Sequence, residues 1–148
     1  MSDPIPKPYR VFFRVVDPTL SLFGVIMHLQ SDKILPNYAL EPTMPPATET
    51  RLLLDALVGF FAGLAFLQAV LLRARPNDVV VWKCLQAATI LIDLAMLAGF
   101  YRALSSTGRL DVSTWRNEEW NNIMINSFVA MIRTLFVLGV GMPKIKEA

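Results

Sequence analysis

Four apolar stretches of membrane-spanning length occupy most of this 148-residue chain. They run approximately over residues 9–29, 52–72, 79–101 and 120–142. About 20 apolar residues, each rising about 1.5 Å along a helix, are enough to cross the hydrocarbon core of a bilayer. Four such helices with their loops account for the whole length, so the sequence predicts one all-α domain, an integral-membrane four-helix bundle.

The composition supports a membrane protein without a cofactor. Hydrophobic residues make up 54% of the chain and charged residues 18%, whereas a soluble domain carries about a quarter charged residues. A soluble helical bundle remains the alternative. The net charge of +2 is not clustered, so nucleic acid is not an expected partner. One histidine and one cysteine cannot build a metal site, and no phosphate- or dinucleotide-binding motif is present.

Each apolar stretch contains at least one group that hydrocarbon should reject. A charged side chain near the bilayer centre costs at least a few kcal/mol, so it usually faces the interior of a bundle and often has a function. The sequence therefore predicts a polar cavity inside the bundle as the place to look for function. The groups concerned are Arg14, Asp17, Asp55, Asp93, Asn126 and Arg133.

Helical spacing aligns polar or small residues into one stripe per stretch, at intervals of three and four residues. Such stripes suit four helices around a wet cavity, and small residues allow close approach of helices. The stripes are Asp17, Ser21, Gly24 and His28; Asp55, Gly59, Ala62, Gly63 and Phe66; Gln86, Thr89 and Asp93; and Glu119, Asn122, Asn126, Ala130 and Arg133.

Depth along the helices predicts which charges meet. Asp17 and Arg133 both lie about 12 Å from the same end of their helices, so we expect them to form an ion pair. Asp93 lies about 21 Å in, with no cation at its depth, so we expect it to be protonated or linked to water. The alternatives are structural: a buried Asp17–Arg133 pair without a catalytic role, and an Arg14 side chain that reaches to the interface.

The connecting segments indicate loops and an orientation. Residues 30–50 hold four prolines and are expected to be irregular, Pro18 should kink the first helix or free a carbonyl, and Asp78 should cap the third helix. Trp115 and Trp120 suit the headgroup level. Basic residues slightly favour the side that holds both termini, Lys144 and Lys146 included. This predicts cytosolic termini in a multi-pass protein of the endoplasmic reticulum.

Carboxylates in an apolar cavity are the chemistry that these residues offer. A protonated carboxyl can donate a proton, while a carboxylate held ionised by arginine can activate water or accept a proton. That pairing suits acid-assisted opening of an epoxide, isomerisation through a carbocation, or a cyclisation. The expected substrate is a lipophilic small molecule that enters from the bilayer.

Three segments resemble a family of small fungal four-span membrane proteins: YRVFFRVVDP at Tyr9–Pro18, TILIDLAM around Asp93, and DVSTWRNEEWNNIMINSFVAMIRTLFVLGVG at Asp111–Gly141. Some members resemble the membrane-bound epoxide hydrolases of aurovertin, citreoviridin and asteltoxin polyketide pathways. The resemblance implies epoxide opening of a polyene-derived substrate. The matching positions are Asp17-Pro18, Asp93, Trp120, Asn122 and Arg133. Met96 stands where members often have histidine, which argues against a histidine-assisted mechanism.

The leading hypothesis is thus a membrane epoxide hydrolase or epoxide-opening cyclase of fungal secondary metabolism. Asp17 or Asp93 would be the base and the other the acid, and Arg133 would orient the ionised carboxylate. The candidate residues that position water or substrate are Asn126, Asn122, Gln86, Asp55, Trp120, Glu119 and His28. Two alternatives stay open: an isomerase of a sterol- or terpene-like lipid, and a non-enzymatic lipid-binding protein. A homo-oligomer is compatible with either.

Overall fold

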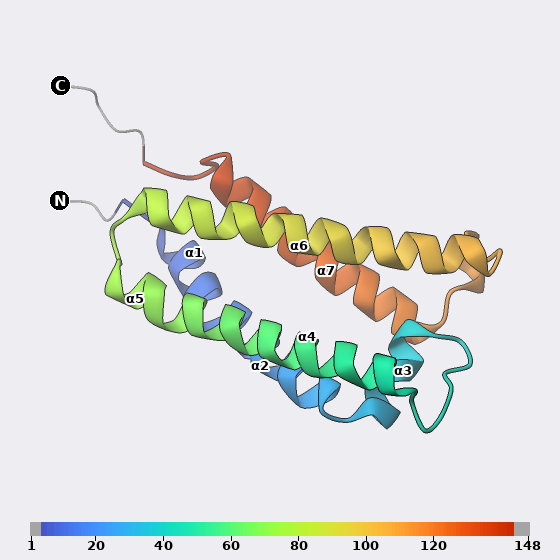
Figure 1. Cartoon of the computed structure of the whole chain (residues 1–148). Helices are drawn as coiled ribbons and strands as arrows, with labels where there is room; N and C mark the ends of the chain where they lie inside the picture. The colour runs from blue at the N-terminus through green and yellow to red at the C-terminus, as the bar shows by residue number, and fades with distance from the viewer. Residues whose placement is uncertain (1–3, 144–148) are drawn as a thin grey trace.

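Two pairs of antiparallel helices make up most of the structure (Figure 1). It is a computed structural model that describes residues 4–143, and no strand occurs among them. In the first pair α2 (Asp17–His28) lies along α4 (Thr48–Phe66), and in the second α6 (Val79–Ser106) lies along α7 (Asn117–Val137). The chain is therefore all-α, as the sequence predicts.

Three continuous helices are long and apolar enough to cross a membrane. The first joins α1 (Lys7–Val11), the π-helical turn η1 (Phe12–Val16) and α2; the second joins α4, the π-helical turn η2 (Leu67–Leu71) and α5 (Leu72–Ala74); the third is α6. The fourth predicted stretch forms α7, which is not among the helices that are long and apolar enough to cross a membrane. Its first two turns carry Glu118, Glu119, Asn121 and Asn122 and lower its hydropathy. These lengths and compositions indicate a membrane protein.

Pro18 shapes the first helix without breaking it. Proline has no N–H, so the carbonyl of Arg14, four residues earlier, loses its helical partner. The turn before Pro18 is π-helical. The Arg73 Nη2 atom donates a hydrogen bond to the Arg14 carbonyl oxygen at 3.5 Å. A side chain from the second helix thus compensates for the proline, as membrane helices require.

A short helix stands where an irregular loop is expected. α3 (Ser31–Tyr38) includes Pro36, and within residues 30–50 only residue 30 and residues 39–47 lack regular structure. Ile34 and Leu35 are buried against Leu54 of α4. The loop prediction is wrong for α3 because tertiary packing, which local composition does not reveal, holds this helix in place.

An aromatic cluster packs where α1 begins and α7 ends, and Figure 1 shows these two helix ends at the same end of the molecule. Phe13, Trp82 and Phe136 are fully buried there. At the same end the Asp78 carboxylate accepts a hydrogen bond from the Val81 N–H at 3.0 Å, which confirms the predicted cap. The first and last residues of the chain lie outside the described residues, and so do Lys144 and Lys146. The orientation of the protein in the membrane therefore stays a prediction.

Replacing Phe13 with alanine should lower the free energy of unfolding by about 3–5 kcal/mol, because it leaves a cavity among four other rings. Phe23, which is 60% exposed on the outer face of α2, is the matched control. Phe23→Ala should change stability by about 0.5 kcal/mol or less. Thermal or denaturant unfolding in detergent measures both. Equal losses would mean that the aromatic cluster does not form.

Candidate active site

A cluster of three buried charges lies at the centre of the structure. From α7, the Arg133 Nη2 atom donates to both carboxylate oxygens of Asp17, at 2.7 and 2.8 Å. Its Nη1 atom donates to both oxygens of Asp93, at 2.6 and 2.5 Å. All three residues are at most 6% exposed. One guanidinium therefore joins a carboxylate from α2 to a carboxylate from α6, and the predicted Asp17–Arg133 ion pair is confirmed.

The expectation that Asp93 has no cation within reach is wrong. Depth counted along the helix axis separates Asp93 from Arg133 by about 9 Å, yet the two side chains form an ion pair. An arginine side chain is long, and helices that cross at an angle bring different depths together. The two carboxylates thus share one cation, instead of one being paired and the other isolated.

Gln68 is a member of the cluster that the sequence reading did not include. It is fully buried in η2, and its Nε2 atom donates to Asp17 Oδ2 at 2.6 Å. Its signal in the sequence is that Asp55 and Gln68 are the only strongly polar residues between 52 and 72. A lone amide in such a run usually has a specific partner.

A cavity of about 560 Å³ opens beside the charged cluster. Side chains from both helix pairs and from α3 line it, so neither pair could form it alone. Its polar contributors are Asp17, Ser21, Tyr38, Asp93, Asn126 and Arg133, and the rest of the wall is apolar and aromatic. A mainly apolar cavity with a few converging polar groups is the usual form of a small-molecule site.

α4 turns a different face to this cavity than its small residues suggest. Leu57, Phe60, Phe61 and Leu64 line the wall, whereas the predicted stripe from Asp55 to Phe66 is exposed. A Cβ added to Gly59 or Gly63 would meet nothing within 4 Å. Asp55 is therefore exposed and does not line this cavity, because α4 turns its large apolar side chains toward the cavity and its small-residue stripe away from it.

His28 forms a hydrogen bond with Tyr38 at the far end of the cavity. The His28 Nδ1 atom lies 2.7 Å from the Gly24 carbonyl oxygen, which can only accept, so Nδ1 carries the proton. In the neutral ring Nε2 then accepts from the Tyr38 hydroxyl at 2.8 Å. Burial raises the pKa of Tyr38 to about 12. The tyrosine, which the sequence reading omitted, therefore stays protonated at neutral pH and lines the cavity.

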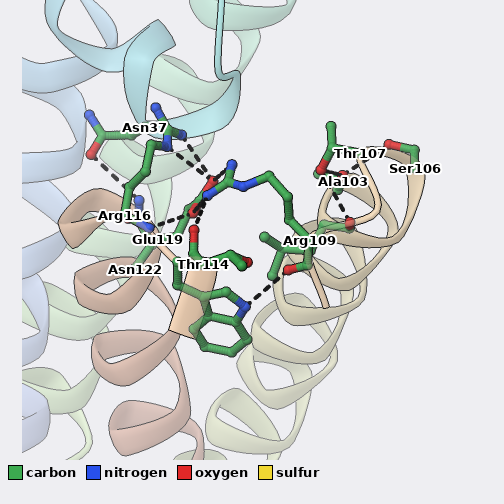
Figure 2. Close-up of polar contacts among 11 residues, drawn as sticks. Asn37, Ala103, Ser106, Thr107, Arg109, Thr114, Arg116, Glu119 and Asn122 are labelled. Carbon is green, nitrogen blue, oxygen red and sulfur yellow. Dashed lines mark hydrogen bonds and ion pairs between the residues drawn. The ribbon is translucent and has the colours of Figure 1, made fainter. Parts of the chain in front are cut away.

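The three predicted amides have different surroundings. Asn126 lines the cavity, and its Nδ2 atom donates to the Asn122 carbonyl at 2.7 Å. Asn122 does not line it; its side chain faces Asn37 at 3.5 Å (Figure 2). Gln86 is fully buried beside Thr89 but is also absent from the wall. Of the three, only Asn126 is placed to meet a ligand in this cavity.

Three buried polar atoms have no hydrogen-bond partner among residues 4–143: Gln68 Oε1, Gln86 Nε2 and Arg133 Nε. Buried polar groups normally have partners, and ordered water commonly supplies them. Two of these atoms belong to the side chains that hold Asp17. They offer an acceptor and a donor for water next to the carboxylates.

Glu119 belongs to a separate cluster at the start of α7 (Figure 2). Its carboxylate accepts from Arg109 at 2.9 and 2.6 Å and from the backbone and side chain of Arg116. It clamps the loop after α6 onto α7 and does not line the cavity. Trp120 is 39% exposed and packs against Trp115. Neither Glu119 nor Trp120 lines the cavity: Glu119 holds the loop after α6, and Trp120 lies at the surface.

Glu119→Gln should lower the free energy of unfolding by roughly 1.5–3 kcal/mol, because it weakens several charge-assisted hydrogen bonds. Burial favours the neutral acid, but the bonds from Arg109 and Arg116 outweigh it and lower the pKa of Glu119 below its ordinary 4.5. The stabilisation is therefore present above pH 4.5 and is lost as the pH falls through the folded-state value. Melting curves against pH test this, with Glu118→Gln as control.

Arg133→Met should cost about 3–5 kcal/mol, because two buried carboxylates lose their shared cation. Adding Asp17→Leu should restore part of that stability, since only one carboxylate then remains without a cation. Unfolding of the single and double variants in detergent measures the coupling. Additive losses would mean that Asp17 and Arg133 do not interact.

Comparison with known proteins identifies a family but no activity. No curated protein and no solved structure matches the chain. Residues 2–143 match the family described as "Domain of unknown function (DUF7704)". The match includes every member of the charged cluster and of the cavity wall. The chain belongs to the DUF7704 family.

Proposed function

We propose that this protein is a membrane-embedded enzyme that opens the epoxide of a lipophilic substrate. One observation carries the proposal: two carboxylates, held by a single guanidinium, stand in the wall of a mainly apolar cavity of about 560 Å³. The apolar wall suits a lipophilic substrate, and the paired carboxylates suit acid–base chemistry.

The charge balance of the cluster supports division of roles between the carboxylates. Arg133 supplies one positive charge to two carboxylates. In this proposal the pair carries one proton, because a single cation balances the charge of only one ionised carboxylate. The ionised member can then accept a proton while the protonated member donates one. Which of Asp17 and Asp93 has which role is left to experiment.

The reaction then needs no other reagent than water. The ionised carboxylate takes a proton from water as the water oxygen attacks an epoxide carbon. The carbon–oxygen bond of the ring breaks, and the protonated carboxyl gives its proton to the leaving oxygen, so the product is a diol. A substrate hydroxyl in place of water gives a cyclic ether. Proton transfer between the carboxylates restores the starting state.

Other groups have supporting roles in this proposal. Asn126 and the Tyr38 hydroxyl reach the cavity wall and would orient the substrate, and Gln68 and Arg133 would hold water beside Asp17. The four long helices would form the bundle around this cavity within the membrane, with cytosolic termini at the endoplasmic reticulum. The resemblance to fungal polyketide epoxide hydrolases points to a polyene-derived epoxide.

A non-enzymatic, lipid-binding role is the competing proposal. It draws on the fact that Asp17 and Asp93 each accept two hydrogen bonds from Arg133, as structural ion pairs do. In that account the cluster only holds helices together and the cavity stores a lipid. Loss of turnover with retention of the fold separates the two.

Membranes containing the protein should convert one or more members of a panel of lipophilic epoxides, polyepoxides included. Asp17→Asn and Asp93→Asn should each reduce the rate by about 10²–10⁴-fold, the usual contribution of a general acid or base. Asp55→Asn is the matched control, because Asp55 is exposed and off the cavity wall. It should keep the wild-type rate. Liquid chromatography with mass spectrometry measures the products.

The product masses discriminate between the reactions. Hydrolysis adds one water, whereas isomerisation and internal cyclisation leave the mass unchanged; the structure of the product separates those two. Wild-type rates in both carboxamide variants, with the fold intact by circular dichroism, would remove the carboxylates from catalysis. The lipid-binding role would then be the better account.

A further inference from the structure

A second, smaller hollow lies at the end of the molecule where the first helix begins. Its volume is about 210 Å³, and Arg10, Val11, Arg14, Val15 and Arg73 line it. Four of these residues belong to one face of the first helix, and Arg73 comes from α5. It is separate from the large cavity, since the two share no lining residue.

Among residues 4–143, three arginines and no acidic residue line the hollow. Within residues 4–143, Arg14 and Arg73 form no ion pair with a carboxylate. Like charges this close repel one another and attract an anion. The hollow therefore has an electrostatic reason to bind a negative group.

Three hydrogen bonds hold two of the arginines, Arg10 and Arg73, in place. Arg10 donates through Nε to the Ile5 carbonyl at 2.9 Å and through Nη2 to Asn77 Oδ1 at 2.9 Å. Arg73 donates to the carbonyl of Arg14 that Pro18 leaves without a helical partner. The side chains are thus partly ordered before any ligand arrives, which lowers the entropic cost of binding.

The apolar part of the hollow indicates where the rest of the ligand lies. Val11 and Val15 are 48% and 54% exposed, one turn apart on the outer face of a helix that is apolar enough to lie in a membrane. A ligand with its anion on the arginines and a hydrocarbon chain along the valines would match both parts. The volume is below the roughly 300–1,000 Å³ of drug-sized ligand sites, so it suits one headgroup phosphate.

We propose that this hollow binds the phosphate of an anionic phospholipid at the membrane interface, with an acyl chain along Val11 and Val15. Guanidinium groups bind phosphate oxygens in pairs of parallel hydrogen bonds, and basic residues at the interface favour anionic lipids. In this proposal Arg14 binds a specific ligand and does not merely extend to the water at the interface. The site is independent of the proposed epoxide chemistry.

Native mass spectrometry of the purified protein with phosphatidylglycerol tests the site. Arg14→Gln and Arg73→Gln should each weaken retention of the lipid about fivefold, the usual effect of one basic residue near a membrane surface. Arg75→Gln is the matched control: Arg75 is exposed on the same turn but does not line the hollow. It should change retention less than twofold. Zwitterionic phosphatidylcholine should bind more weakly than phosphatidylglycerol throughout.

Three results would overturn the proposal. Equal losses in all three variants would mean diffuse attraction, and equal retention of both lipids would mean that charge is not recognised. Displacement of the lipid by inorganic phosphate at similar concentrations would indicate a site for free phosphate. If a glutamine variant fails to fold, Arg14→Lys and Arg73→Lys keep the charge but lose the paired geometry. Each lysine variant should weaken binding more than the Arg75→Gln control does and less than fivefold, and retention equal to that of the wild type would contradict the site.

Discussion

The buried guanidinium of Arg133 is the interaction on which the rest of the structure depends. A charge taken into an apolar interior costs several kcal/mol unless it is paired and hydrogen-bonded. Arg133 meets that demand with Asp17 from α2 and Asp93 from α6, and Gln68 extends the cluster to the second helix. One cluster therefore ties together all four long helices, and its position fixes where the cavity lies.

The need to pair the buried charge of Arg133 also explains why polar groups meet an apolar cavity. Large apolar side chains of α4 line part of the wall, and the polar groups of the wall are those of the charged cluster, Ser21, Asn126 and Tyr38. A lipophilic molecule can occupy the apolar part while one end meets the carboxylates. The π-helical turns η1 and η2 lie at Asp17 and Gln68, and such turns are frequent at functional sites.

Much of this arrangement could be predicted from the sequence, and the misses have physical causes. Apolar runs located the long helices, and three of the four polar stripes are the ones that the structure buries. Depth along an axis says nothing of the reach of a side chain, so the link from Asp93 to Arg133 was not visible. The rotation of α4 about its own axis depends on where its large side chains pack, and this rotation places Asp55 on the outside of the structure. Tyr38 was missed because α3 is stabilised only by tertiary packing.

The match to the DUF7704 family spans residues 2–143 and therefore includes the charged cluster and the cavity wall. The central claim is that the cluster activates water inside the membrane. The most direct measurement is turnover of a lipophilic epoxide without a free hydroxyl, in water enriched in oxygen-18. The account predicts one labelled oxygen in the diol and no label in the Asp17 or Asp93 carboxyl after a single turnover. Unlabelled product, or label in either carboxyl, would contradict water activation by the paired carboxylates.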